Sequence, residues 1–408
     1  MANALTFDIT DTCHVNAILN IVRDFRWTDR WKKEPNAFPD RKRVNDMLTY
    51  KTQPFTPLHL MEEPVNNSIK TMVLCTVEKA IDLLHNGYTD IVVATPNDDP
   101  IKKVCNVVGL QTMSSDIILN NKNNMNFDFI VGNPPYDKGI KHNLSLPFGN
   151  KVGIYSAFCY AVKDWLADEG VCTLVLPCNF MCLPSASSFR KWMIDNYQIV
   201  KVELHDNSKQ QIFDIGMSDV LVLTFKKTKN INNQKVVWKA YGTTEFEVDI
   251  TKYNIWPMYK NAESMIIFDN VMQGKVSDIT HFDGGSTKKQ MTPRTPYFIS
   301  GNLTRMGARQ NPNPRESNKF QKNKMRDVKA PMWVAFDSSK ENDIQYEWMG
   351  TSHYAYVLSM VQSTPLNQPV FFSLMGVHNF EDTNFNSKFS ITAAQQAEID
   401  RWYNETIN

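Results

Sequence analysis

Short apolar runs alternate with amphipathic stretches from residue 70 to residue 227. The runs Lys70–Leu74, Thr89–Ala94 and Phe127–Gly132 have the length and apolar content of buried strands. Between the first two, Val77–Asn86 has helical spacing. This alternation predicts an α/β fold with a mostly parallel sheet, whose functional residues lie at the carboxyl ends of the strands.

The same alternation continues to residue 227. Apolar side chains from Tyr155 to Leu166 fall on one helical face, and Gly170 is expected to end that helix. A further helix-and-strand step is expected at the two runs Val107–Leu110 and Asp116–Leu119. Other elements are expected at Val171–Leu176 (strand), Ser185–Asp195 (helix), Ile199–Leu204 (strand) and Ser218–Phe225 (strand).

The two ends of the chain differ from this central part. Between Val22 and Arg43, basic residues mix with aromatic ones, which favours a helical cap with a basic outer surface. Towards the C-terminus, strand-like runs at Met332–Phe336 and Pro369–Leu374 precede a helix expected at Thr392–Thr406. We therefore predict a cap over residues 1–50, an α/β domain over 51–230 and a mixed α/β domain over 231–408.

Composition narrows the class of protein. Of the 408 residues, 42% are hydrophobic and 21% charged, no apolar run is long enough to span a membrane, and the first residues lack a signal peptide. The seven cysteines are scattered, and Cys178 and Cys182 have no second pair at zinc spacing. The expectation is a soluble cytoplasmic protein without a metal site and without a membrane partner.

The motif Asn133-Pro134-Pro135-Tyr136 directly follows the strand Phe127–Gly132. An adenine exocyclic amine is a poor nucleophile because its lone pair is delocalised into the ring. The Asn133 side-chain oxygen and the Pro134 carbonyl can each accept one N–H of such an amine, which leaves the lone pair exposed. Proline fixes φ and offers no competing donor. The motif therefore predicts an amine-holding active site; an ordinary Pro-Pro turn after a strand is the alternative.

Tyr136 would stack on the face of the base, a contact worth roughly 1–3 kcal/mol. A base inside a duplex cannot reach such a turn, so it must be flipped out. Methyl transfer from a sulfonium leaves the nitrogen cationic and easily deprotonated, so no strong general base is needed. Positioning carries the catalysis and can supply roughly 7–11 kcal/mol.

The net charge of +1 hides a basic stretch from Lys288 to Lys329, in which only Glu316 and Asp327 are acidic. A solvated loop is the alternative, but such a stretch on a chain with a base-holding motif favours double-stranded DNA as partner. The residues expected to contact DNA are Lys288, Lys289, Arg294, Arg305, Arg309 and Arg315.

With these motifs in order, the chain resembles the gamma-type adenine-specific (N6) DNA methyltransferases, the TaqI-like order. The resemblance implies a class I methyltransferase domain with a Rossmann-like, mostly parallel sheet, a C-terminal mixed α/β DNA-recognition domain, and S-adenosylmethionine as methyl donor. It places Phe55, Thr56 and Pro57 at the methionine end of the donor and Asp116 at its adenine. It makes Phe213 an aromatic beside the flipped base.

The turn that should hold the donor departs from the family. In the family a glycine-rich turn follows the first strand, but no Gly-x-Gly occurs in this chain, and Val77, Glu78 and Lys79 occupy that place. At the end of the second strand, Asn97 aligns with the acidic residue expected on the ribose, and Asp98 is close enough to serve. The donor-binding turn is therefore degenerate.

Three functions remain open from the sequence. The first is site-specific adenine-N6 methylation of DNA, alone or with a partner subunit. The second is a catalytically impaired, methyltransferase-like DNA-binding subunit or decoy in restriction-modification or phage defence. The third is methylation of another planar amide or amine, such as a protein glutamine or a ribosomal RNA guanine.

Overall fold

The computed structural model describes two compact units. The described residues are 7–25, 55–95, 101–115, 125–136, 144–149, 152–206, 213, 219–231, 233–277, 297–301, 321–324, 332–336, 344, 347–348, 351–361, 377–378 and 383–407. Unit 1 comprises Met1–Cys178, Ser185–Trp238 and Glu247–Lys252. Unit 2 comprises Asn179–Pro184, Lys239–Phe246 and Tyr253–Asn408.

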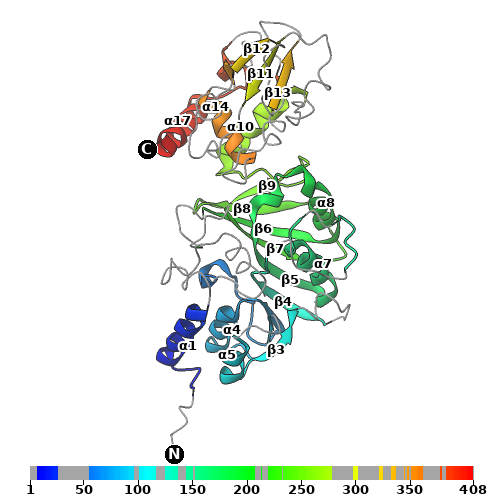
Figure 1. The fold of residues 1–408 in the computed structure, drawn as a ribbon, viewed down its shortest axis with the longest axis vertical. Helices are drawn as coiled ribbons and strands as arrows, with labels where there is room; N and C mark the ends of the chain where they lie inside the picture. Colours follow the sequence, from blue (N-terminus) through cyan, green and yellow to red (C-terminus); the bar gives the residue numbers. More distant parts are fainter. Residues whose placement is uncertain are drawn as a thin grey trace, which may run out of the picture. The chain divides into compact units, whose positions relative to one another are not determined.

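A nine-stranded sheet organises unit 1 (Figure 1), with strand order β3-β2-β1-β4-β5-β7-β6-β8-β9. Its strands are β1 (Thr71–Leu74), β2 (Ile91–Thr95), β3 (Gln111–Ser114), β4 (Phe127–Gly132), β5 (Leu166–Pro177), β6 (Gln198–His205), β7 (Val220–Lys226), β8 (Lys235–Ala240) and β9 (Phe246–Asp249). The first five are parallel, and β7 runs antiparallel to both β5 and β6. This order, with β7 reversed between β5 and β6, is the class I methyltransferase fold, a Rossmann-like arrangement. The predicted fold class is confirmed.

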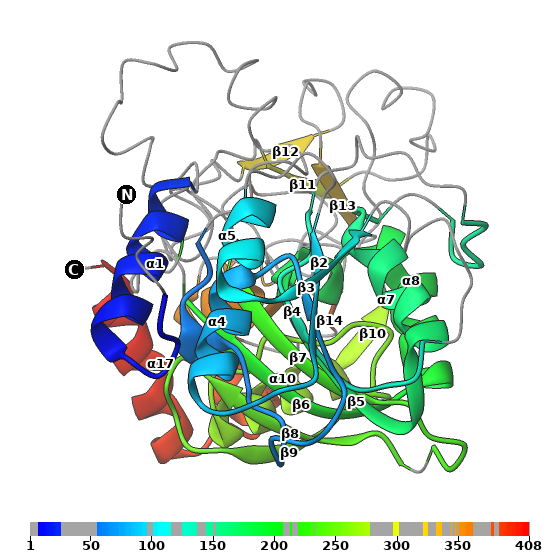
Figure 2. The same cartoon turned by 90° about the horizontal axis from the view of Figure 1, so that it is seen from below.

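Helices cover both faces of this sheet. Figure 2 shows α1, α4 and α5 on one side and α7 and α8 on the other. The described helical segments of unit 1 are α1 (Thr12–Phe25), η1 (Leu58–Leu60), α4 (Val77–His85), α5 (Ile101–Val108), α7 (Tyr155–Trp165) and α8 (Ser187–Asn196). Two short segments, η2 (Cys178–Met181) and η3 (Pro184–Ala186), have residues in both units.

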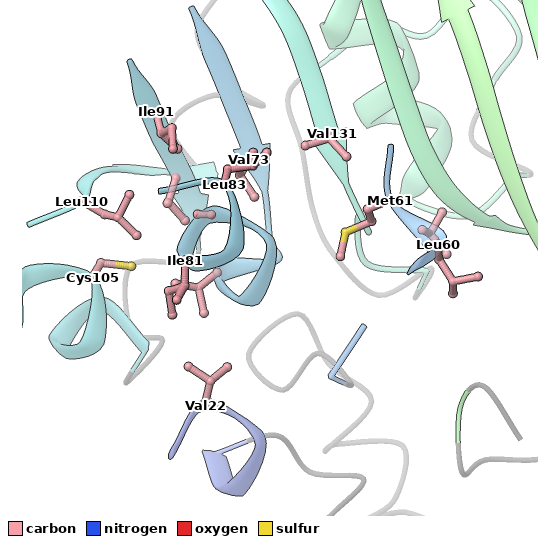
Figure 3. Packing of buried hydrophobic residues seen from close by; sticks show 14 of the residues in the cluster. Val22, Leu60, Met61, Val73, Ile81, Leu83, Ile91, Cys105, Leu110 and Val131 are labelled. Carbon is pink, nitrogen blue, oxygen red and sulfur yellow. The ribbon is translucent and has the colours of Figure 1, made fainter. Parts of the chain in front are cut away.

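One buried cluster anchors α1, α4 and α5 to the sheet. Val22 of α1 and Ile81 of α4 are fully buried in it, as are Val73 of β1 and Val131 of β4 (Figure 3). These side chains come from positions with helical spacing on α4 and from alternate positions on the strands, as an amphipathic helix on a sheet requires. The cluster fixes the positions of the chain segments that leave β1 and β4.

The expected helix end at Gly170 was wrong. The helix α7 ends at Trp165, and Leu166 already pairs with Phe127 of β4. Gly170 lies inside β5, where Glu169 takes a φ of 67° beside the bulge. The apolar face continued past the helix only through Leu166, which is buried, whereas Asp168 and Glu169 are exposed.

Unit 2 has a mixed α/β composition. Its antiparallel strands form two small sheets, one of order β12-β11-β13 and one that pairs β10 with β14. They are β10 (Lys275–Ser277), β11 (Tyr297–Gly301), β12 (Gln321–Lys324), β13 (Met332–Phe336) and β14 (Val377–His378); the helices are α10 (Ala262–Gln273), α14 (Ser352–Val361), α16 (Phe385–Lys388) and α17 (Ala393–Ile407). The run Pro369–Leu374, expected as a strand, lies outside the described residues.

Fully buried Trp348 centres the aromatic core of unit 2. Its ring lies 4.7 Å from that of Phe389 and 5.9 Å from that of His378, centroid to centroid. The helices α10, α14 and α17 contact one another beside this core. Among the described residues, no helix has both the length and the apolarity needed to cross a membrane.

Candidate active site

The site lies where the strand order changes direction. The strand β1 has β2 on one side and β4 on the other, so the chain leaves the carboxyl ends of β1 and β4 at the topological switch point. The turn after β1 is the expected donor turn, and the turn after β4 is Asn133–Tyr136. The fold therefore brings the two predicted halves of the site together.

Gly132 allows the two strand ends to approach closely. A Cβ at this position would lie 2.1 Å from the carbonyl oxygen of Leu74, much closer than any side chain tolerates. The next residue, Asn133, donates its backbone N–H to that same oxygen over 3.1 Å. The glycine thereby places Asn133 directly beside the turn after β1.

The Asn133 side chain is buried, and only one end of its amide is hydrogen-bonded. The residue is 1% exposed, and its Nδ2 donates to the Thr56 Oγ1 over 3.1 Å. Its Oδ1 is buried and has no hydrogen-bond partner. A buried unsatisfied oxygen costs about 1–3 kcal/mol, so one that persists calls for an explanation such as a ligand. Asn133 can accept an N–H from a bound amine.

Tyr136 is held by two contacts. Its hydroxyl donates to the Val175 carbonyl of β5 over 3.1 Å, and its ring meets Tyr155 edge to face at 6.2 Å and 87°. Burial raises the pKa of Tyr136 well above its ordinary value, so the phenol stays neutral. The preceding residues Pro134 and Pro135 are buried. These two contacts fix the Tyr136 ring at the end of the turn.

Gly153 makes room for this arrangement. A Cβ there would lie 2.7 Å from the Tyr136 carbonyl oxygen and 2.6 Å from the Tyr155 ring. Sequence reasoning did not assign Gly153 or Tyr155 to the site. The available signal was a lone glycine two residues before Tyr155, the aromatic first residue of α7, and it is a weak one.

Phe213 is 3% exposed and belongs to the buried cluster on the α1, α4 and α5 side of the sheet. The structure thus places its ring among apolar side chains, which include Val175 and Val220 of the neighbouring strands.

The turn after β1 keeps a left-handed backbone without glycine. Cys75 takes a φ of 61°, and its N–H donates to the Ala94 carbonyl over 2.8 Å. Such a conformation costs a non-glycine residue roughly 1–3 kcal/mol. The surrounding structure therefore holds Cys75 in a left-handed conformation that a glycine would adopt without this cost.

The bulky residues of this turn are packed inside the protein. Val77, Glu78 and Lys79 are each at most 2% exposed. Lys79 pairs with Asp82 over 2.8 Å and with Glu63 over 3.4 Å. The Glu78 Oε1 accepts the backbone N–H of Thr56 over 2.7 Å. Glu78 stands in the first turn of α4, a position that the helix dipole makes favourable for an acidic side chain.

Thr56, expected with Phe55 and Pro57 to line the methionine end of the donor, contacts Glu78 of this turn. Phe55 is half-buried beneath the Arg23 guanidinium, 4.6 Å from the ring centroid. Thr56 is fully buried between Glu78 and Asn133. The turn keeps a left-handed backbone at Cys75, but every residue from Leu74 to Lys79 is at most 3% exposed, so the turn itself presents no open surface for S-adenosylmethionine.

Several predicted residues lie outside the described part of the chain. They are Asn97, Asp98 and Asp116 near the donor, and Lys288, Lys289, Arg294, Arg305, Arg309 and Arg315 for DNA. Within the residues that are described, no three His, Cys, Asp or Glu side chains gather as a metal site would require.

The family described as "Eco57I restriction-modification methylase" matches residues 77–213, about a third of the chain. The match spans α4, the turn after β4 and Phe213, and it confirms the resemblance to restriction-modification DNA methyltransferases. Fold and match together show a class I methyltransferase fold with a segment that is similar to restriction-modification methylases. Among curated proteins, none matches this chain.

Several solved structures match parts of this chain at low identity. One is the type IIG restriction endonuclease BpuSI, with 9% identity, a TM-score of 0.42, and coverage of 83% of this chain and 58% of that one. A type I restriction-modification methyltransferase subunit from Streptococcus thermophilus has 18% identity, a TM-score of 0.34, and coverage of 46% and 47%.

A putative class I S-adenosylmethionine-dependent methyltransferase from Listeria monocytogenes has 10% identity, a TM-score of 0.35, and coverage of 44% and 60%. The chain thus spans about half of the length of these three proteins. At these scores they support no inference beyond what the strand order and the family match establish.

Proposed function

We propose that this protein is a site-specific DNA methyltransferase that transfers a methyl group from S-adenosylmethionine to the N6 amine of a flipped-out adenine. The observation that carries the proposal is the buried, unpartnered Oδ1 of Asn133 at the switch point of a methyltransferase fold. The match to restriction-modification methylases supports DNA as the substrate.

In this proposal the turn after β4 holds the amine through two acceptors. The Asn133 Oδ1 takes one N–H and the Pro134 carbonyl takes the other, which draws the nitrogen towards a tetrahedral geometry. The Tyr136 ring stacks on the base, and Tyr155 keeps that ring in place. Phe213 is the candidate for the other side of the base, and it would have to leave the cluster in which it is buried.

S-adenosylmethionine supplies an electrophilic methyl group on a sulfonium when it is bound. Phe55, Thr56 and Pro57 would line its methionine end, Asn97 or Asp98 would meet the ribose and Asp116 the adenine. The methylated nitrogen is cationic and loses its proton readily, so the chain needs no strong base. The work of the protein residues is orientation and exclusion of water.

We further propose that residues 231–408 form the target-recognition domain. In this view Lys288, Lys289, Arg294, Arg305, Arg309 and Arg315 contact DNA phosphates or bases. In the same proposal, residues 51–230 form the α/β domain and residues 1–50 an N-terminal helical cap; β8 and β9, which follow residue 230, extend the sheet of the α/β domain. The family match supports DNA as the partner. The proposal allows the protein to act alone or with a partner subunit.

The closed donor turn favours a second candidate, a DNA-binding subunit or decoy without catalysis. Every residue from Leu74 to Lys79 is at most 3% exposed, so a donor that touches this turn must first gain access to it. Isothermal titration of S-adenosylmethionine, with and without duplex DNA, separates the two candidates. Micromolar binding of S-adenosylmethionine supports the methyltransferase. Binding of DNA without any binding of S-adenosylmethionine supports the DNA-binding subunit or decoy without catalysis.

The proposed function predicts that Asn133→Ala abolishes methyl transfer while the protein stays folded. The assay follows radiolabelled methyl groups from S-adenosylmethionine into unmethylated DNA, followed by digestion and nucleoside analysis. Wild type should yield N6-methyladenine, and the variant none above background. Val237→Ala, an exposed change on β8, is the matched control. Transfer that is unchanged in Asn133→Ala, or a methyl group found on another base, contradicts the proposal.

A further inference from the structure

A chain of hydrogen bonds joins the donor turn to the amine-holding asparagine. The Glu78 Oε1 accepts the Thr56 N–H over 2.7 Å, and the Thr56 Oγ1 accepts the Asn133 Nδ2–H over 3.1 Å. The chain ends at the unpartnered Asn133 Oδ1. Its three residues come from the first turn of α4, from the segment before η1 and from the end of β4.

All three residues are shielded from water. Glu78 and Thr56 are fully buried, and Asn133 is 1% exposed. Hydrogen bonds are stronger in such surroundings, and one to a carboxylate is about twice as strong as a neutral one. The carboxylate of Glu78 therefore fixes the backbone of Thr56, and that backbone fixes the position of the Thr56 hydroxyl.

The orientation of the Asn133 amide decides what it can hold. One end of the amide accepts hydrogen bonds and the other end donates them. With Nδ2 bound to Thr56, the oxygen is the free end, and it can accept from an amine. Rotated by half a turn, the amide would present N–H groups to the N–H groups of the substrate, and the site would repel it.

We propose that Thr56 and Glu78 are positioning residues for Asn133, which orient its amide so that the oxygen faces the substrate amine. The inference rests on the proposed function. It gives Glu78, which stands where the family has a glycine-rich turn, a role of its own. A glycine there would keep the turn but lose the carboxylate that anchors Thr56.

Substitutions at Thr56 test the inference. Thr56→Val keeps the shape but loses the hydroxyl, and kcat should fall about tenfold, the rate equivalent of one hydrogen bond. The KM value for DNA should stay within about twofold, because Thr56 makes none of the proposed DNA contacts. Thr56→Ser keeps the hydroxyl and should restore kcat to within about threefold of wild type.

Two further variants separate positioning from a loss of packing. Glu78→Gln keeps a carbonyl oxygen that can accept the Thr56 N–H, so it should lose less activity than Glu78→Ala. Thr173→Val removes another buried hydroxyl, one that donates to Glu62 over 3.2 Å, away from this chain of contacts. It should leave kcat unchanged. An equal loss in Thr56→Val and Thr56→Ser, or a loss shared by Thr173→Val, overturns the inference.

A readout without activity keeps this inference apart from the proposed function. In crystal structures, the Asn133 amide should rotate or lose its fixed position in Thr56→Val and keep it in Thr56→Ser. If wild type transfers no methyl group but the amide responds in this way, the proposed function fails and the positioning role stands. If the Asn133 amide is unchanged in Thr56→Val, the positioning role is wrong.

Discussion

Single residues at the switch point define how near the strand ends of unit 1 can come. Gly132 touches the Leu74 carbonyl so closely that no side chain fits. Cys75, in contrast, accepts a left-handed backbone that glycine would adopt more easily. Position 132 requires a glycine because a side chain there would collide with backbone, and a local movement cannot relieve that collision. Position 75 does not require one, because a left-handed φ costs a non-glycine residue only a limited free energy.

Gly132→Ala should lower the free energy of unfolding by at least about 3 kcal/mol, because the clash involves backbone that cannot rotate away. Urea unfolding followed by tryptophan fluorescence measures the change. Gly109→Ala is the control, since Gly109 has a φ of 75° but open space around its Cβ position. It should lose only about 1 kcal/mol. Equal losses in the two variants would show that space at Gly132 is not the limiting factor.

At the scale of elements, β14 and α10 meet at a buried histidine in unit 2. His378 is 4% exposed, lies next to the Phe389 ring at 5.1 Å, and its Nε2 bonds to the Val271 carbonyl over 3.0 Å. Burial lowers the pKa of His378 to about 4, with smaller contributions from Lys388 and Lys275; the Val271 bond opposes the shift. The imidazole is therefore neutral in the folded unit.

The stability of unit 2 should fall as the pH drops from about 6.5 to about 4. The unfolded histidine takes up a proton near pH 6.5, whereas the folded one does so only near pH 4, so acid favours the unfolded state across that window. The full effect is roughly 3 kcal/mol.

Thermal unfolding at a series of pH values measures this dependence. His353, whose pKa burial also lowers, contributes in the same direction. His378→Gln should flatten the dependence in part, while an unchanged pH profile would exclude His378 as its source.

At the scale of the whole molecule, the proposed DNA partner can be tested through charge. Replacing Arg305, Arg309 and Arg315 together by glutamine should weaken DNA binding. It should also reduce the slope of log K against log salt by up to about 3, because each phosphate contact contributes about 0.9. Fluorescence anisotropy over a range of salt concentrations measures both quantities.

The matched control replaces three lysines of unit 1 that already form exposed ion pairs, Lys191, Lys229 and Lys235. That triple variant has the same loss of charge and should retain the wild-type salt slope. If the two triple variants behave alike, the basic stretch contributes only through net charge and does not contact DNA.

The amino-acid sequence by itself determined the alternation of elements and the turn that follows β4. The expected strand Phe127–Gly132 coincides with β4, and the expected helix at Val77–Asn86 differs from α4 by one residue. The periodicity of apolar residues and the effects of proline and glycine extend over only a few neighbouring residues. These features can therefore be predicted from the sequence alone. The end of α7 was misplaced because pairing with Phe127, a distant residue, begins β5 at Leu166.

Only the tertiary structure decided how the site is built. The Asn133–Thr56 bond joins residues 77 positions apart, the Thr56–Glu78 bond spans 22, and the Tyr136–Val175 bond spans 39. The sequence does not show that the Asn133 amide keeps its oxygen unpartnered, nor that the Glu78 side chain is buried in a turn that lacks glycine. Those facts depend on which strands lie side by side, and the sheet order that sets this is a property of the folded chain as a whole.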